Sequence, residues 1–391
     1  MDFQTIRKLD GEYLAATYAR YPVALVGGKN ATLVDSEGKQ YIDFGAGIAV
    51  NIFGANDEQW KAAVIEQLGK IQHVSNYYYA EPQVRLAQML CERTGAKRVF
   101  FSNSGGEANE CALKAARKYS FMRYGEDRSR IVSLKNSFHG RTLFTLTATG
   151  QDEFHRYFSP FVPEVAYAAP DMEEVVRAAD GRACAVIIEC VQGESGVSAL
   201  PKAFVQALSH WCSENDVLLI CDEVQCGNGR GGTLYAYEQY GITPDIATTA
   251  KGLAGGLPLG ATLLGDKVAD LFTPGSNGST FGGNPIAAAG ALYVLSGLDD
   301  DLLAGVRRKS EQIRAALTGA PGVESVTGLG LMLGVQTTLP AKEVASRCIG
   351  RGVLVLTAKD KVRLLPALNI PDDLLMQAIG ILKDICAEGV Q

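Results

Sequence analysis

The sequence predicts an α/β fold: a large domain with a mostly parallel sheet covered by helices, and a smaller α+β domain. Short apolar or β-branched segments alternate with longer segments of helical spacing through the middle of the 391-residue chain, as in β-α-β units. This alternation stops near residue 286, where long helical segments predominate. We therefore expect a large domain over residues 51–285 and a small domain made of residues 1–50 and 286–391.

The individual elements are predicted in chain order. A hairpin over residues 31–44, "ATLVDSEGKQYIDF", comes first and is assigned to the small domain. Six strands of the large sheet are predicted at 98–102, 130–134, 184–191, 217–224, 245–250 and 261–265. Helical spacing covers 107–124 and 201–216, and Pro201 suits the first turn of the second helix. Helices from about 286, over 300–317 and over 371–389, with strands at 323–328 and 353–358, complete the small domain.

Composition and charge favour a soluble, cytoplasmic protein with a small-molecule substrate. The formal net charge is -6, and the 37 Lys and Arg residues are scattered, so no basic surface for nucleic acid is expected. Nine cysteines without a C-x-x-C pair indicate reduced thiols rather than disulfides or a zinc site. The N-terminal segment lacks the apolar core of a signal peptide, and no apolar run approaches the length of a membrane span.

The segment "SNSGGEANE", residues 102–110, places two glycines between a predicted strand and a predicted helix. Backbone N–H groups in the first turn of a helix have no partner within the helix and carry partial positive charge, so they can bind an anion. The alternative is an ordinary helix start, with Ser104 as N-cap and Glu107 completing a capping box. Both interpretations predict that a helix begins here.

Two charged residues follow predicted strands of the sheet. Asp222 ends the apolar strand "VLLICDE", and Lys251 ends the next one and precedes several glycines. Each has an ordinary alternative, because Asp222 could cap a turn and Lys251 could be a solvated charge. Together with an anion-binding helix start, however, they match the needs of pyridoxal 5'-phosphate: a lysine for its aldehyde, a carboxylate for its ring nitrogen and N–H groups for its phosphate.

A glycine-rich segment offers a different hypothesis. "GNGRGG", residues 227–232, matches the G-x-G-x-x-G pattern of dinucleotide-binding proteins. The preceding Asp222 and Glu223 would place negative charge beside a pyrophosphate, and "TLYAYEQYG" is a weak start for a helix. The dehydrogenase hypothesis is therefore disfavoured.

Several segments together resemble a known family. "FSNSGGEANE", "SFHGRT", "LICDEVQCGNGR", "PDIATTAKGLAGGLPLGA" and "GSTFGGNP" are similar, in this order, to segments of the class III (ω-amino acid) aminotransferases, which have the fold type I architecture of pyridoxal-phosphate enzymes. With "DFGAGIAVN" and "KVRLLPALNI" the resemblance covers nearly the whole chain. Within the class, "GIAVN", "SNYYYAEPQ" and "RLLPALNI" are most similar to the acetylornithine aminotransferases.

The resemblance implies a set of cofactor-binding residues. Lys251 would bind the cofactor aldehyde covalently, and Asp222 would pair with the pyridine nitrogen. Gln225 would hydrogen-bond the ring hydroxyl, and Phe138 would stack on the ring, although an ordinary core position is the alternative for Phe138. The implied set is completed by Gly105, Gly106, Glu223, Val224 and Thr280.

The resemblance also implies substrate-binding residues and a homodimer. Arg141 would hold a substrate carboxylate, unless it forms a surface ion pair instead. Arg363 would bind the α-carboxylate of glutamate, and Glu194 would neutralise Arg363 when an ω-amino substrate is bound; a structural ion pair is the alternative. In the family, the segment "GSTFGGNP" crosses to the neighbouring subunit, where Thr280 would reach the other site's phosphate while Ser279 lies near the substrate.

The implied reaction is transfer of the δ-amino group of N2-acetyl-L-ornithine to 2-oxoglutarate, giving N-acetylglutamate 5-semialdehyde and L-glutamate in arginine biosynthesis. Succinylornithine, ornithine or 4-aminobutyrate are alternative substrates, and an aminomutase or a non-catalytic protein of this fold are alternative functions. The chain departs from the family pattern at Gly106, where a Thr or Ser is usual, at Cys190, where a Pro is usual, and at "GANDEQ", which replaces "GHxHP". None of these departures affects Lys251, Asp222 or Arg141, so they weaken the assignment of the substrate more than the assignment of the reaction type.

Overall fold

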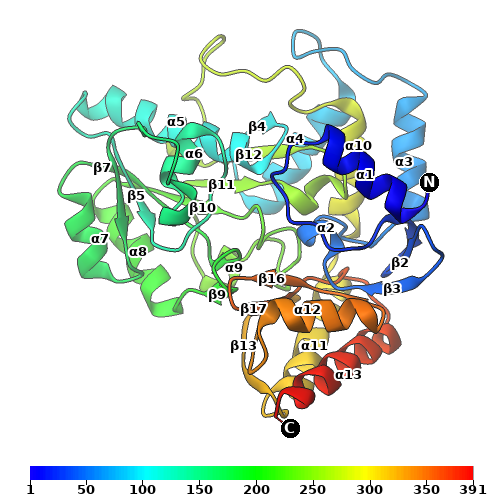
Figure 1. The fold of residues 1–391 in the computed structure, drawn as a ribbon. Coiled ribbons are helices and arrows are strands. Elements are labelled where there is room, and N and C mark those ends of the chain that lie inside the picture. Colours follow the sequence, from blue (N-terminus) through cyan, green and yellow to red (C-terminus); the bar gives the residue numbers. More distant parts are fainter. Residues whose placement is uncertain (391) are drawn as a thin grey trace.

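A seven-stranded sheet forms the centre of the larger part of the protein (Figure 1). The computed structural model describes residues 1–390. The strands are β4 (Arg98–Ser102), β5 (Arg130–Leu134), β6 (Val165–Ala168), β7 (Ala183–Ile188), β10 (Leu218–Asp222), β11 (Ile246–Thr249) and β12 (Gly260–Leu264). Their order is β4-β12-β11-β10-β7-β5-β6, and β12 runs antiparallel to both neighbours while the other neighbouring pairs are parallel. The prediction of a mostly parallel sheet is confirmed.

Helices bury both faces of this sheet, as the central strand β10 shows. Leu218 and Ile220 belong to one apolar cluster with residues of helix α5 (Gly105–Tyr124). Leu219 and Cys221 point to the opposite face and belong to a second cluster with residues of α8 (Lys202–Glu214). Because successive side chains of a strand alternate between faces, burial on both faces requires the continuous apolar run seen in this segment.

Most predicted strands and helices lie within a few residues of their observed bounds. The segment predicted at 184–191 divides into β7 and a short strand β8 (Val191–Gln192), which pairs with β9 (Ser198–Ala199). Helix α5 begins at Gly105 rather than at residue 107. Pro201 is the cap before α8 rather than part of its first turn. Strand β6 was not predicted.

Two smaller sheets accompany the large one. The predicted hairpin is confirmed as β2 (Thr32–Asp35) and β3 (Gln40–Asp43), which pair with β1 (Leu25–Lys29) and β15 (Val353–Leu354). Strands from both ends of the chain therefore share one sheet, as a small domain of residues 1–50 and 286–391 would require; that division stays a prediction. The other sheet has the order β13-β14-β17-β16, with β13 (Val323–Leu329), β14 (Met332–Thr337), β16 (Leu356–Ala358) and β17 (Lys361–Leu364).

The remaining helices surround these sheets (Figure 1). They are α1 (Phe3–Tyr13), α2 (Ala46–Ala49), α3 (Glu58–Leu68), α4 (Glu81–Thr94), α6 (Leu143–Ala148), α7 (Met172–Ala179), α9 (Tyr237–Tyr240), α10 (Pro285–Gly297), α11 (Asp300–Leu317), α12 (Ala341–Gly350) and α13 (Asp372–Ala387). Short 3-10 turns are η1 (Asp152–Phe154), η2 (Lys251–Ala254), η3 (Asp266–Val268) and η4 (Glu388–Val390). Among residues 1–390, none of the helices combines the length and the apolar character needed to cross a membrane.

Candidate active site

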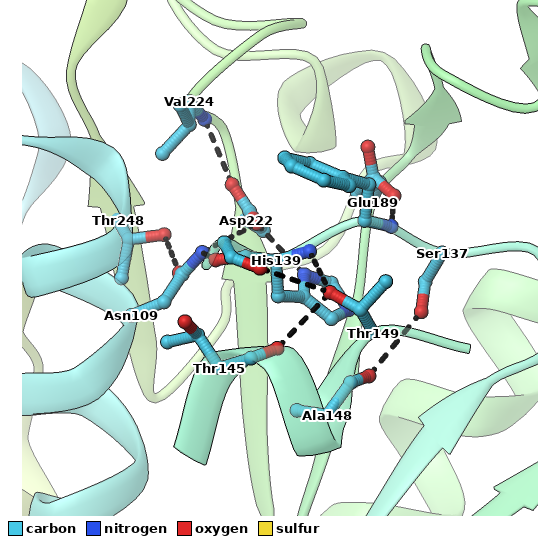
Figure 2. Close-up of polar contacts among 12 residues, drawn as sticks. Asn109, Ser137, His139, Thr145, Ala148, Thr149, Glu189, Asp222, Val224 and Thr248 are labelled. Atoms are coloured by element: carbon cyan, nitrogen blue, oxygen red, sulfur yellow. Dashed lines mark hydrogen bonds and ion pairs between the residues drawn. The ribbon is translucent and has the colours of Figure 1, made fainter. Parts of the chain in front are cut away.

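The carboxylate of Asp222 is the centre of a buried polar network (Figure 2). Its Oδ2 accepts a hydrogen bond from Asn109 Nδ2 at 2.7 Å and lies 2.8 Å from His139 Nδ1. Its Oδ1 accepts from the Val224 backbone N–H at 3.0 Å. Asn109 in turn accepts a hydrogen bond from the Thr248 hydroxyl at 2.6 Å. Contacts on both oxygens fix the orientation of the carboxylate.

The strand register explains why these residues meet. Asp222 is paired with Thr248 of β11, and Cys221 is paired with Ile188 of β7, which places Glu189 beside Asp222 at the same edge of the sheet. Glu189, Asn109 and Thr248 were not predicted as site residues. The position of Glu189 just after a buried strand was a usable signal, the same one that identified Asp222.

Burial and neighbouring charges shift the titration of the acidic residues here. Burial, reinforced by Asp222, raises the pKa of Glu189 well above its usual range, although Glu189 accepts a hydrogen bond from the Phe138 N–H at 2.8 Å. Burial also raises the pKa of Glu223, to about 7. The Glu223 carboxylate accepts the N–H groups of Ala236 and Tyr237, both at 2.9 Å. The Glu223 backbone N–H donates to the Thr248 carbonyl at 2.8 Å as well, so the predicted cofactor contact of Glu223 stays a prediction.

Lys251 is the first residue of η2, immediately after β11. Its φ of 36° lies in the left-handed region that non-glycine residues rarely occupy, so the surrounding packing must hold it there. The side chain is half-buried. Burial lowers the pKa of Lys251, and the nearby Glu194, Asp222 and Glu189 only partly oppose this effect. A half-buried amine with a lowered pKa is a better nucleophile than the solvated lysine of the alternative interpretation.

The helix start predicted at the glycine pair is present, but the capping box is only half formed. The Ser104 hydroxyl accepts the Glu107 N–H at 3.2 Å, as predicted. The Glu107 carboxylate, however, accepts the N–H of Asn103 at 2.6 Å rather than that of Ser104. The reason is that the Asn103 side chain also donates to the same oxygen, at 2.9 Å, and so draws the carboxylate one residue back.

The two glycines of this segment have different surroundings. A Cβ at Gly105 would lie 2.5 Å from Cγ1 of Val224, so only glycine lets the start of α5 pack against the residues after Asp222. At Gly106 the nearest atoms would be 3.9 Å away, in ordinary contact. Gly105 therefore joins the helix start to the Asp222 strand end, while the space beside Gly106 is open.

Arg363, Glu194 and Gln225 form one hydrogen-bonded group. Arg363 Nη1 donates to Glu194 Oε1 at 2.7 Å and to Gln225 Oε1 at 3.1 Å, and Gln225 Nε2 donates to Glu194 Oε1 at 3.0 Å. Burial alone would raise the pKa of Glu194, but Arg363, together with Lys251 and Gln225, outweighs burial and lowers that pKa. Both ends of the Gln225 amide are engaged, so its contact with a ring hydroxyl stays a prediction.

Arg141 lies against aromatic rings. Its guanidinium is 5.4 Å from the centre of the Phe138 ring and 4.3 Å from that of Phe154, which was not predicted. The two rings meet edge to face at 5.6 Å. Within residues 1–390 no ion pair involves Arg141, which leaves its charge available to an anionic substrate.

Ser279 and Thr280 lie apart from Lys251 within one chain. Together with Asn103 and Glu107 they line a cavity of about 410 Å³ that neither Lys251 nor Asp222 lines. The Ser279 hydroxyl accepts a hydrogen bond from Asn103 Nδ2 at 3.2 Å, and Thr280 is exposed. Their predicted roles would require this segment to act in a neighbouring subunit.

The residues present fit pyridoxal 5'-phosphate. A fixed, buried carboxylate suits a protonated ring nitrogen, a half-buried amine with a lowered pKa suits an aldehyde, and a glycine helix start with open space suits a phosphate. The dinucleotide alternative is not supported. Residues 227–232 form turns, and the helix that follows them, α9, has only four residues.

Comparisons with known proteins agree with the site. The sequence model of the family described as Aminotransferase class-III matches residues 13–386. The acetylornithine aminotransferase of Haemophilus ducreyi is 48% identical over 99% of this chain and 100% of its own length. The succinylornithine transaminase of Salmonella typhimurium is 44% identical over 95% of this chain and 94% of its own.

Solved structures show the same relationship. N-acetylornithine aminotransferase from Stenotrophomonas maltophilia is 34% identical, with a TM-score of 0.84 over 97% of this chain and 98% of that one. Ornithine aminotransferase from Toxoplasma gondii, described with pyridoxal phosphate at its active site, is 28% identical, with a TM-score of 0.93 over 98% of this chain and 94% of that one. The chain therefore belongs to the class III aminotransferases, fold type I enzymes that depend on pyridoxal 5'-phosphate.

Proposed function

We propose that this aminotransferase transfers the δ-amino group of N2-acetyl-L-ornithine to 2-oxoglutarate, producing N-acetylglutamate 5-semialdehyde and L-glutamate in arginine biosynthesis. The observation that carries the proposal is the ion pair between the buried Arg363 and the half-buried Glu194. One site must accept a dicarboxylate in one half-reaction and an amine-tailed substrate in the other, so it needs a cation that can be neutralised. Full-length relatives named acetylornithine aminotransferase, 48% and 42% identical, support the choice of substrate.

The proposed cofactor contacts follow from the residues described. Lys251 would hold the aldehyde, Asp222 the ring nitrogen, and the N–H groups at Gly105 and Gly106 the phosphate, with Phe138 against the ring. Further contacts are assigned to Glu223, Val224, Gln225 and Thr280. When bound, the cofactor supplies an electron sink for the substrate carbon that loses a proton.

The chain's own residues move and hold the proton. Lys251, whose pKa is lowered by burial, would take the proton from the substrate carbon that bears the amino group and would deliver it to the carbon that receives this amino group. His139 and Asn109 hold the Asp222 carboxylate in place, so that it keeps the facing nitrogen protonated. These two residues therefore position a charge without contacting the substrate.

Substrate recognition rests on two arginines. Arg141, which forms no ion pair in the described chain, holds one carboxylate of either substrate. Arg363 binds the second carboxylate of glutamate or 2-oxoglutarate when Glu194 has moved away from it. With N-acetylornithine bound, the Glu194–Arg363 pair at 2.7 Å stays closed and presents no net charge to the δ-carbon that bears the reacting amino group, where this substrate has no carboxylate.

We further propose a homodimer with composite active sites, located in the cytoplasm. Tyr77, Tyr79 and Phe281 are 94%, 100% and 59% exposed in the single chain, an apolar surface that a second copy would cover. Asn76 ties this surface to the predicted crossing segment, since its side chain donates to the Ser279 carbonyl at 2.9 Å. The nine free thiols fit a reducing compartment.

The test is a single-donor assay with the purified, cofactor-loaded enzyme. N-acetylornithine alone should convert the visible absorption band of the bound cofactor to that of its amino form, and 2-oxoglutarate should then restore it with release of glutamate. Lys251→Ala should abolish both changes, while Lys70→Ala, at a lysine with 64% side-chain exposure, should not alter them.

Each alternative predicts a different outcome of this assay. A response only to succinylornithine, ornithine or 4-aminobutyrate would identify that compound as the substrate in place of N-acetylornithine. Succinylornithine is the leading alternative, because relatives named succinylornithine transaminase are 44% identical to this chain. Isomerisation of the donor without 2-oxoglutarate would indicate an aminomutase. A protein that gains no visible band with pyridoxal phosphate would be non-catalytic.

A further inference from the structure

The guanidinium of Arg141 is held by aromatic rings alone. Among residues 1–390, its side chain donates no hydrogen bond and forms no ion pair, although it is exposed in the loop between β5 and α6. A guanidinium that lies over a ring uses its face, so the N–H donors along its edge stay free. These donors are the groups that would bind a carboxylate at two points.

Phe154 provides the nearer of the two rings. The centre of its ring is 4.3 Å from the Arg141 guanidinium, against 5.4 Å for Phe138. Attraction between a cation and a ring face weakens with distance and matters only within about 6 Å. Phe154 also meets the Phe138 ring edge to face, at 5.6 Å. It therefore contacts both the arginine assigned to the substrate and the ring assigned to the cofactor.

Contacts on both sides of Phe154 fix the position of its ring. The Gln151 side chain donates to the Ser137 carbonyl at 3.0 Å, and the Phe154 N–H donates to the Gln151 carbonyl at 3.1 Å. On the other side, His155 Nε2 lies 2.9 Å from the Leu146 carbonyl oxygen of α6. An arginine loses rotamer freedom when it binds a ligand, and contact with a fixed ring in the free protein reduces this loss.

We propose that Phe154 is a positioning residue, whose ring holds the Arg141 guanidinium with its donor edge free for the substrate carboxylate. The inference rests on the proposed function, in which Arg141 binds one carboxylate of either substrate. Phe154 acts through Arg141, so its effect should be confined to compounds that carry this carboxylate. It is the α-carboxylate of N-acetylornithine and the side-chain carboxylate of glutamate.

The first test removes the ring and the carboxylate in turn. In the cofactor-loaded enzyme, Phe154→Leu should raise KM for N-acetylornithine and for glutamate about two- to fivefold, with kcat nearly unchanged. It should not alter the conversion of N-acetyl-1,4-diaminobutane or of 2-aminobutyrate, which lack the carboxylate that Arg141 would bind. Phe154→Tyr keeps the ring and should behave as the wild type. Phe158→Leu, at a 54% exposed position of the same loop, is the matched control.

The second test changes the charge distribution of the ring at nearly constant shape. Replacing Phe154 by phenylalanines with increasing numbers of ring fluorines withdraws electron density from the ring face, so KM for glutamate should rise stepwise. The absence of this trend, or an equal effect of Phe154→Leu on compounds with and without the carboxylate, would overturn the proposal. If glutamate is converted but N-acetylornithine is not, the proposed substrate fails, while the glutamate comparison still decides the role of Phe154.

Discussion

Replacing Gly105 by Ala should separate the start of α5 from the residues that follow Asp222. The new Cβ would lie 2.5 Å from Cγ1 and 2.9 Å from Cγ2 of Val224, closer than carbon atoms approach. Such overpacking costs about 1–3 kcal/mol, and the better helix propensity of alanine returns up to about 1 kcal/mol. We therefore expect a net loss of up to about 3 kcal/mol in the free energy of unfolding.

Cofactor binding should weaken in the same variant, because the Val224 N–H anchors the Asp222 carboxylate at 3.0 Å. Thermal unfolding of the cofactor-free protein measures the stability, and titration of the visible band with pyridoxal phosphate measures the affinity. Gly106→Ala is the matched control: its nearest neighbour would be 3.9 Å away, so it should keep both properties. Gly105→Ala combined with Val224→Ala should recover them. Equal behaviour of the two single variants, or no recovery in the double variant, would refute the steric argument.

Three other predictions concern charge. Glu194→Gln leaves Arg363 without its anionic partner, so kcat/KM for the glutamate half-reaction should rise about tenfold relative to the acylornithine half-reaction, as measured by single-donor kinetics. His139→Asn should lower kcat about tenfold with little change in KM. A tenfold change corresponds to the free energy of one hydrogen bond to the Asp222 carboxylate, which His139 contacts at 2.8 Å. Burial lowers the pKa of Lys251 in the folded protein below its usual 10.5, the value expected in the unfolded chain. At a pH between the lowered pKa and 10.5, the unfolded chain therefore binds more protons than the folded one. Stability of the cofactor-free protein should therefore rise with pH across this window, measured as the difference from Lys251→Met, which lacks the titrating amine.

Strand ends explain which site residues were predictable. Asp222 ends a strand with a continuous apolar run, and Lys251 follows the neighbouring buried strand. Parallel strands end at the same edge of a sheet, so both residues could be assigned from sequence. Asn109 could not, because it contacts Asp222 across 113 positions and resembles any polar residue within a helix. Gln225 was assigned to the cofactor, yet in the structure its amide bridges Glu194 and Arg363, a contact set by long-range packing.

The missed strands have local reasons. Strand β6 is only four residues long, lies at the edge of the large sheet and is mostly half-buried, so its apolar signal is weak. Strand β14 contains Gly334, which suggests a turn from sequence alone. In the structure a Cβ at Gly334 would lie 2.9 Å from the Gly196 carbonyl oxygen, so this glycine admits a close backbone contact instead of ending the strand.

If Lys251, Asp222 and the start of α5 surround one cofactor, Lys251 is the residue that binds it covalently, and mapping the modified lysine is the sharpest test. The purified protein would be loaded with pyridoxal phosphate and treated with sodium borohydride, which makes the bond between the lysine and the cofactor aldehyde permanent. Digestion and mass spectrometry then identify the modified residue. One modified lysine per chain is expected, at Lys251; modification of any other lysine, with Lys251 unmodified, would show that the cofactor binds elsewhere.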